Sequence, residues 1–292
     1  MAEETKPKTA APAPKAKKSG AKIDLASIGG LALALTGILG GLMIEGGRLK
    51  DVAQFTAAMI VLGGTIGAVL VSTPLAVALG AAKRFAGVFR DESKPLDEML
   101  EEVIQYAAKA RKNGLVSLEQ DADAIQDPFL KKALNLAVDG TDLQELRKML
   151  ELEIEMEEQH VEAEAKVFES AGGYAPTIGI IGAVLGLIQV MKNLANIEEV
   201  GHGIAVAFVA TVYGVGSANL LFLPAASKIK ARFAAEVHRK EMIVEAISGI
   251  VEGLNPKLIR LKLEAYVPPA PAKKAKKEKA PAVKPAAAPA KG

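Results

Sequence analysis

Residues 170–189 read Ser-Ala-Gly-Gly-Tyr-Ala-Pro-Thr-Ile-Gly-Ile-Ile-Gly-Ala-Val-Leu-Gly-Leu-Ile-Gln, and this stretch decides the fold. The part Tyr174–Val190 carries no charge, and Gly179, Gly182 and Gly186 recur at helical spacing along one face. In water such a helix would be poor, because each glycine costs roughly 0.8–1 kcal/mol relative to alanine. In lipid, helices keep their backbone hydrogen bonds, and small residues let neighbouring helices approach closely. The stretch therefore predicts a membrane span built for tight packing.

The composition also favours membrane helices. Of the 292 residues, 50% are hydrophobic but only 4% are aromatic, with 27 glycines and no cysteine or tryptophan. Abundant glycine suits close-packed membrane helices, and the lack of cysteine excludes disulfides, zinc thiolates and thiol catalysis. The alternative, a buried helix of a soluble protein, is disfavoured because three similar segments accompany the stretch.

These segments are Leu25–Ile44, Val52–Ala82 and Gly203–Ala226. Each is long enough for the roughly 20 residues that cross a bilayer. The first exceeds the apolar region of a signal peptide, so we expect an uncleaved span. The second is longer than one crossing needs, and we expect it to tilt or to bend at Pro74.

Two further prolines mark the other spans. We expect Pro176 to free a backbone carbonyl and either bend the third span or mark its start, and Pro224 to end the fourth. Residues 192–202 are expected to form the polar connection between these two spans. Small residues of the fourth span are expected to face the glycines of the third.

The region 83–170 is charged and predicts helices. A first helix is expected between Pro95 and Gly114, because apolar residues recur there at three-to-four spacing. Asp127-Pro128 resembles a helix start and Gly140 a stop. Thr141-Asp-Leu-Gln144 has the form of a capping box. A glutamate-rich helix should follow and run into the third span, interrupted at most at Gly172-Gly173.

Lysine and arginine predict the orientation. They concentrate in residues 1–22, 83–94 and 228–280, whereas the loops 45–51 and 192–202 hold few. The positive-inside rule then places both termini and the long loop in the cytoplasm. The predicted fold is an all-α membrane protein with four transmembrane helices, a helical cytoplasmic loop and a C-terminal amphipathic helix. Its segments are a basic tail (1–22), spans one and two (23–82), a cytoplasmic domain (83–170), spans three and four (171–226), a cytoplasmic helix (227–267) and a Lys/Pro/Ala tail (268–292).

The two tails are expected to be disordered, because they lack the apolar residues that build a core. They could bind anionic membrane lipids, worth about 1 kcal/mol per lysine near the surface, or act as linkers.

Little in the sequence indicates enzyme chemistry. No Asp, Glu, Lys or Arg lies inside the predicted spans, so this chain cannot supply a proton-binding acid at membrane depth. His160, His202 and His238 show no metal-ligand spacing, and no phosphate loop or nucleophile–base pair is present. We therefore expect no enzyme, cofactor, metal site or nucleic-acid partner. Thr211 is the candidate polar group at depth, although a lone threonine in a span more often bonds its own preceding carbonyl.

The span order and several motifs resemble the flagellar-stator branch of the MotA/TolQ/ExbB channel family. The resemblance covers about residues 23–268 and is carried by the span order and four motifs: Ile-Val-Leu-Gly-Gly-Thr-Ile-Gly-Ala (60–68), Ala-Arg-Lys-Asn-Gly-Leu-Val-Ser-Leu-Glu (110–119), Ala-Pro-Thr-Ile-Gly-Ile-Ile-Gly-Ala-Val-Leu-Gly-Leu-Ile (175–188), and Ala-Thr-Val-Tyr-Gly (210–214) with Pro224. The second motif and the presence of two spans before the long loop favour the stator branch, since ExbB-like and TolQ-like chains resemble one another in having three spans.

The resemblance implies a flagellar motor subunit of the bacterial inner membrane. It implies a ring of five copies around two copies of a single-span MotB-type partner, whose aspartate carries the proton. Thr211, Ala183 and Pro176 would belong to the ion path, and Pro176 and Pro224 to conformational coupling. Sodium-driven relatives carry a second threonine where Ala183 stands, so the resemblance favours protons.

The resemblance further implies that Arg111 and Glu119 meet the rotor protein FliG. From the residues alone, a solvated face around a turn is the favoured explanation of these charges. Two other functions stay open: an ExbB/TolQ-like or gliding-type energiser of envelope processes, and a structural membrane scaffold without ion flow.

Overall fold

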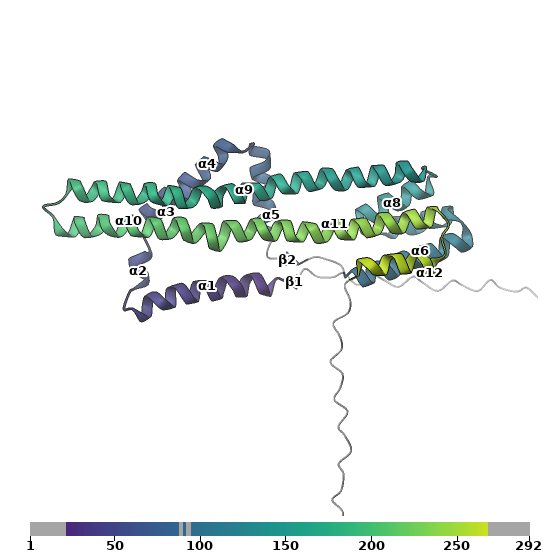
Figure 1. Cartoon of the computed structure of the whole chain (residues 1–292), viewed down its shortest axis with the longest axis horizontal. Helices are drawn as coiled ribbons and strands as arrows, with labels where there is room; N and C mark the ends of the chain where they lie inside the picture. Colours follow the sequence, from purple (N-terminus) through teal and green to yellow (C-terminus); the bar gives the residue numbers. More distant parts are fainter. Residues whose placement is uncertain (1–21, 88–89, 92–94, 268–292) are drawn as a thin grey trace, which may run out of the picture.

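The computed structural model describes residues 22–87, 90–91 and 95–267, so the predictions for residues 1–21 and 268–292 lie outside it. Figure 1 shows a long molecule in which two helical rods run side by side, with shorter helices against them. One rod is α9 (Leu143–Lys192). The other is formed by α10 (Ile197–Ser217), a π-helical turn η3 (Ala218–Phe222) and α11 (Leu223–Val251).

Close packing of the two rods confirms the prediction from the glycines. A Cβ atom built on Gly186 would lie 2.7 Å from the Gly203 carbonyl oxygen, and one on Gly214 would lie 2.6 Å from the Ala175 carbonyl oxygen. Both distances are too short for any side chain. Only glycine therefore permits this approach of α9 and α10, as expected of small residues between membrane helices.

The rods also correct two predicted boundaries. Pro224 was expected to end the fourth span, and the helix itself does not end there but continues through it to Val251. The wide turn η3 directly precedes Pro224 and accommodates a residue that has no backbone N–H to donate. The polar connection is also shorter than 192–202, because Asn196 caps α10 through a bond from the Glu198 N–H to its side chain.

Helix α9 confirms the expectation of one helix from the charged region into the third span. It continues without a break through Gly172-Gly173 and Pro176, so Pro176 lies inside the helix and does not begin it. The predicted capping box is wrong by one position: Asp142, not Thr141, is the N-cap, and its carboxylate accepts from the Gln144 N–H at 3.3 Å.

The first span, α1 (Leu25–Ile44), has the predicted bounds and no buried residue. The second predicted span is a series of pieces: α2 (Leu49–Val52), α3 (Phe55–Ala58), a π-helical turn η1 (Met59–Gly63), α4 (Gly64–Ser72) and α5 (Leu75–Gly87). The break between α4 and α5 confirms the bend at Pro74. Thr73 is extended there, because proline disfavours a helical residue before it.

The charged end of the molecule contains the remaining elements. They are α6 (Leu96–Asn113), the 3₁₀ turn η2 (Leu115–Leu118), α7 (Glu119–Ala124), α8 (Pro128–Val138), α12 (Pro256–Leu263) and the 3₁₀ turn η4 (Glu264–Tyr266). A short antiparallel pair, β1 (Lys22–Ile23) with β2 (Arg90–Asp91), matches Lys22 with Asp91.

Start and stop signals in this region are confirmed. Asp127 caps α8 by accepting from the N–H groups of Phe129 and Leu130, both at 3.0 Å. Gly114 and Gly140 follow α6 and α8 with φ of +82° and +75°, a conformation that favours glycine. The main apolar core lies here, where Leu130 and Leu134 of α8 pack with residues of α6, α9, α11 and α12.

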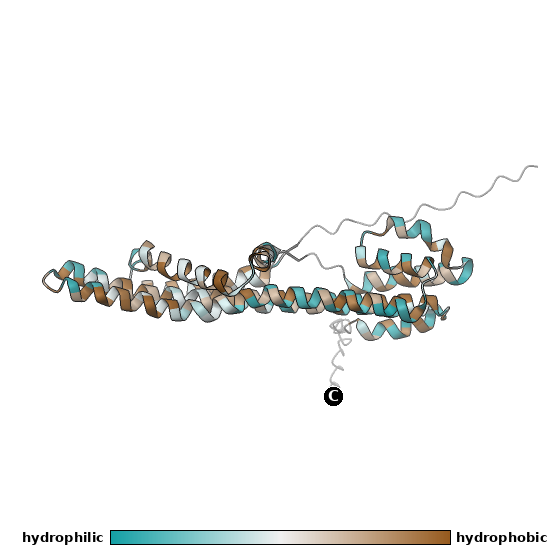
Figure 2. Ribbon diagram, turned by 90° about the horizontal axis from the view of Figure 1, so that it is seen from above, coloured by the Kyte–Doolittle hydropathy of each residue, from teal (hydrophilic) through white to brown (hydrophobic). Residues whose placement is uncertain are grey.

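Figure 2 shows how hydropathy divides the molecule: brown, apolar residues dominate the half that contains the α9–α10 turn, whereas teal residues are interleaved in the other half. Within the described residues, four helical segments are long and apolar enough to cross a membrane: Leu25–Ile44, Leu49–Ser72 and parts of Leu143–Lys192 and Ile197–Val251. The predicted all-α membrane fold with four spans is therefore confirmed.

Candidate ion path and rotor-facing surface

The α9–α10 pair holds two of the predicted ion-path residues at neighbouring levels. Thr211 is half-buried on α10, and its hydroxyl donates to the Ala207 carbonyl at 3.2 Å. A Cβ built on Gly179 would lie 3.5 Å from the Cα of Thr211, and one on Gly214 would lie 3.2 Å from the Cα of Pro176. Close glycine contacts thus hold Pro176 and Thr211 in one tightly packed segment of the pair.

The other two predicted residues lie on either side of this level. Ala183 is half-buried on α9, one helical turn beyond Gly179 toward the α9–α10 turn. Pro224 is exposed on α11. Its neighbour Leu223 packs on Gly172, because the Leu223 Cδ2 atom lies 2.6 Å from where a Cβ of Gly172 would be. Pro176 and Pro224 therefore occupy separate turns of the two rods.

The membrane part of the rods leaves a broad apolar surface uncovered. The exposed side chains are Ile180, Ile181, Val184, Leu185, Leu187 and Ile188 on α9, and Ile204, Phe208, Val212 and Val215 on α10. No charged side chain interrupts the segments 174–190 and 203–226 from which they come. Such a surface can contact lipid or another apolar helix, but it cannot itself bind a proton.

Tyr213 is a structural residue whose role the sequence analysis missed. Its hydroxyl donates to the Val52 carbonyl and accepts from the Gln54 N–H at 3.3 Å. Those two groups lie at the break between α2 and α3, where no helical partner is available. A tyrosine inside an apolar span was the available signal, because a buried phenol usually finds a hydrogen-bond partner.

Ion pairs join the shorter helices to the rods on the side away from the α9–α10 turn. Asp24, at the start of α1, binds the Lys228 ammonium at 2.5 Å and the Arg232 guanidinium at 3.1 Å, both on α11. The hydrogen bond from Lys228 is the main cause that holds the pKa of Asp24 far below its usual value. On α9, the buried Glu164 pairs with Arg84 of α5.

Arg111 and Glu119 flank one turn, as predicted. Arg111 lies in the last turn of α6, and Glu119 begins α7 beyond Gly114 and the short η2. Both side chains are exposed, and neither forms an ion pair with another described residue. Leu118 anchors the turn in the core, and the Lys109–Asp121 pair at 2.6 Å links α6 to α7. With the exposed Lys112 beside Arg111, the turn therefore presents charges of both signs to the solvent.

Comparisons with known proteins identify the relatives of this chain. The family model described as MotA/TolQ/ExbB proton channel family matches residues 121–242, and the model described as Motility protein A N-terminal matches residues 28–114. Motility protein A of Bacillus subtilis (strain 168) is 34% identical over 247 residues, which cover 84% of this chain and 92% of the relative. Chemotaxis protein PomA of Vibrio alginolyticus is 29% identical over 239 residues, covering 80% of this chain and 94% of PomA.

Solved structures agree. The C. jejuni MotAB structure matches with a TM-score of 0.81 at 34% identity, covering 87% of this chain and 100% of that chain. The flagellar MotAB stator complex from Bacillus subtilis matches with a TM-score of 0.78 at 34% identity, covering 84% and 96%. Sequence and fold thus agree over both membrane pairs and the cytoplasmic helices, and the chain belongs to the MotA/TolQ/ExbB proton channel family.

Proposed function

We propose that this chain is a stator subunit of the flagellar motor. Together with a MotB-type partner it conducts protons across the bacterial inner membrane and converts the flow into torque on the rotor. The observation that carries this proposal is the 34% identity to Motility protein A over 84% of the chain. The separate match of residues 28–114 to the Motility protein A N-terminal model favours the stator over an ExbB/TolQ-like or gliding-type energiser.

The ion path requires a second protein. Segments 174–190 and 203–226 hold no acid, so a single-span partner supplies the aspartate that binds the proton. Its helix lies against the uncovered apolar surface of α9 and α10, inside a ring of five copies of this chain. Thr211 lines the path, with Pro176 and Ala183 beside it. The small apolar Ala183 offers no oxygen to a sodium ion, which supports protons as the driving ion.

Conformational coupling follows from the two rods. A proton that falls through about 150 mV releases roughly 3.5 kcal/mol. That energy can shift a two-state packing equilibrium a few hundredfold. Pro176 and Pro224 each lack a backbone N–H, so we place the flexing of the rods at these residues, and the long helices α9 and α11 carry the movement to the cytoplasmic helices. There the exposed Arg111 and Glu119 meet charged residues of the rotor protein FliG.

The membrane orientation is supported by the distribution of basic residues. Lys228, Lys230 and Arg232 on α11 and Lys83 and Arg84 on α5 lie just beyond the apolar segments on the side of the charged helices. The positive-inside rule places this side, and both termini, in the cytoplasm. Lipid covers the exposed side chains of α1, which has no buried residue.

This function can be tested by deleting the gene for this chain in its organism and complementing the deletion strain. We expect the deletion strain to assemble flagella that do not rotate, and we expect the wild-type chain to restore rotation. Envelope transport should be unchanged. A strain that still swims after deletion but loses a transport process across the envelope would favour the energiser.

A further inference from the structure

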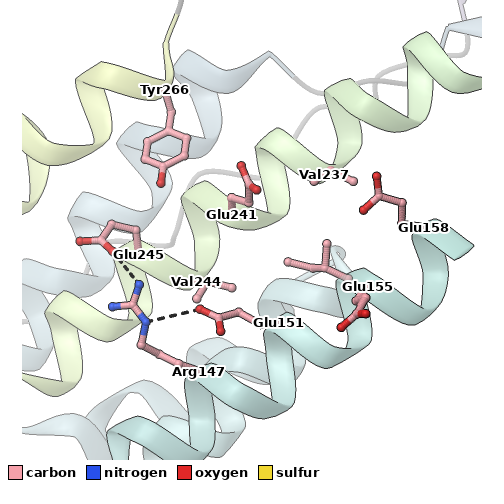
Figure 3. A pocket seen from close by; sticks show the side chains of 10 residues that line it. Arg147, Glu151, Glu155, Glu158, Val237, Glu241, Val244, Glu245 and Tyr266 are labelled. Atoms are coloured by element: carbon pink, nitrogen blue, oxygen red, sulfur yellow. Dashed lines mark hydrogen bonds and ion pairs between the residues drawn. The ribbon is translucent and has the colours of Figure 1, made fainter.

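A groove of about 410 Å³ lies between the charged halves of the rods, far from the proposed ion path. Its lining includes the apolar Ile154 of α9 and Val237 and Val244 of α11. In Figure 3, Tyr266 of η4 stands over one end, near Glu241 and Glu245, and Glu158 lies toward the opposite end. The groove thus offers both apolar walls and an aromatic ring to a segment that lies along it.

The groove carries a negative charge that Arg147 and Lys262, which both pair with Glu245, balance only in part. Five glutamates line it, with Arg147 as the one basic residue in its lining. Arg147 is already bound to Glu245 at 3.1 Å and to Glu151 at 3.7 Å. Glu155 and Glu158, at the end away from Tyr266, form no ion pair with any described lysine or arginine. Glu155 accepts only a long hydrogen bond from the Gln159 amide, at 3.4 Å, so a basic occupant would find two carboxylates without an ion pair at this end.

The chain itself leaves the described region beside this groove. The Tyr266 carbonyl is bonded to the His238 ring at 2.9 Å, and the two rings lie 5.1 Å apart, so the exit point is held on α11. Burial, and then the charges of Glu245 and Glu241, raise the pKa of the Tyr266 phenol. The acidic field of the groove therefore reaches the residue from which the C-terminal segment departs.

The sequence that follows complements the groove in charge and length. Residues 268–292 contain one acid and seven lysines, at positions 273, 274, 276, 277, 279, 284 and 291. From Val267, six extended residues reach about 20 Å at roughly 3.3 Å per residue. The groove follows α9 from Arg147 to Glu158, about 16 Å at 1.5 Å per residue. The first lysines can therefore reach the carboxylates of Glu155 and Glu158.

We propose that residues 268–280 of this same chain bind in the groove, with the lysines at 273–277 against Glu155 and Glu158. The tether gives the segment a high effective concentration, so weak ion pairs suffice to hold it. The bound segment covers the acids of the groove and keeps its lysines away from anionic lipid. This inference is independent of torque generation and would stand if the proposed function failed.

Cysteine cross-linking in the full-length chain, purified with its partner, tests the proposal, because the natural sequence contains no cysteine. One cysteine replaces Ala275, between the lysines, and a second replaces the apolar Val237 in the groove, which leaves Glu155 and Glu158 in place. The matched control pairs Ala275→Cys with Met156→Cys, whose side chain is exposed but does not line the groove. We expect at least fivefold more intramolecular disulfide in the groove pair at low salt, and a fall toward the control at 0.5 M salt, which screens ion pairs.

Charge removal provides the second arm. Neutralising Glu151, Glu158 and Glu241 to glutamine should lower the disulfide yield, whereas neutralising the exposed Glu145, Glu162 and Glu252, outside the groove, should not. Equal yields in groove and control pairs would overturn the proposal. Disulfide-linked dimers would overturn it in favour of a neighbouring copy's groove. Loss of the disulfide in bilayers with anionic lipid, but not in zwitterionic bilayers, would overturn it in favour of the membrane surface.

Discussion

At the residue scale, the packing of α9 on α10 depends on glycines, which have a hydrogen atom where other residues have a side chain. A Cβ on Gly214 would lie 2.6 Å from a backbone oxygen, and backbone cannot move aside easily. We expect Gly214→Ala to lower the stability of the purified complex by about 1–3 kcal/mol, the usual cost of overpacking. Thermal unfolding in detergent measures this.

Gly173, on the partner helix α9, is the matched control, because a Cβ there meets nothing within 4 Å. Gly173→Ala should leave the unfolding midpoint unchanged or raise it, since alanine favours a helix. Equal destabilisation by both substitutions would show that helix propensity, not close approach, explains the glycines.

Thr211 carries the residue-scale prediction for ion flow. Thr211→Val keeps the shape of the side chain but removes the hydroxyl that donates to the Ala207 carbonyl. Because that bond lies within one helix, we expect normal amounts of protein in the membrane but at least a severalfold loss of torque in tethered cells. Thr177→Val is the control, since Thr177 is exposed and bonds its own helix in the same way, to the Tyr174 carbonyl at 2.8 Å. Undiminished torque in Thr211→Val would favour the scaffold without ion flow.

At the scale of the element, Asp24 connects α1 to α11 through two cations. Because its pKa is lowered in the folded chain, the contribution of Asp24 to stability is complete above its unfolded pKa of about 3.9. That contribution is lost as the pH falls below this value toward the folded pKa. We expect Asp24→Asn to lower the unfolding midpoint at pH 7, and the gap to the wild type to narrow below about pH 4. A gap that stays constant with pH would rule out the charge as its cause.

Several elements could be predicted from the sequence, because local signals are strong in them. The bounds of α1 follow from an uninterrupted apolar run, and α8 follows from the Asp127-Pro128 start and the glycine stop at Gly140. A helix end at Pro224 was wrong for a physical reason. A proline breaks a regular α-helix, but the preceding wide turn at Ala218–Phe222 removes the conflict, and nothing in the local sequence marks such a turn.

At the scale of the whole molecule, long-range contacts escaped prediction. The pairing of Tyr213 with Val52 and Gln54, or of Glu164 with Arg84, joins residues far apart in sequence, and periodicity carries no information about such partners. The candidate site was predictable only in part. Its residues were found through the resemblance to a family, whereas the structure shows that Pro176 and Thr211 lie close and that Pro224 stands apart.

The arrangement of the whole molecule also explains how one chain can join a membrane process to a rotor. Both rods run from the apolar segments into the charged helices without interruption, so a shift in the membrane has a stiff path to the far end. The exposed turn with Arg111 and Glu119 lies in that far region and belongs to the same core as the rods. Charges presented on such a turn can exchange partners as a rotor moves past.

The most direct measurement is therefore tethered-cell rotation with Arg111→Glu and with Glu119→Lys, each combined with opposite charge changes on the rotor protein. We predict that each single substitution reduces torque severalfold at normal membrane levels, and that the compensating rotor change restores it. Glu145→Lys, at an exposed site on α9, is the control and should rotate normally. Normal rotation in both Arg111→Glu and Glu119→Lys would contradict the account. It would indicate that these charges only form part of a solvated surface.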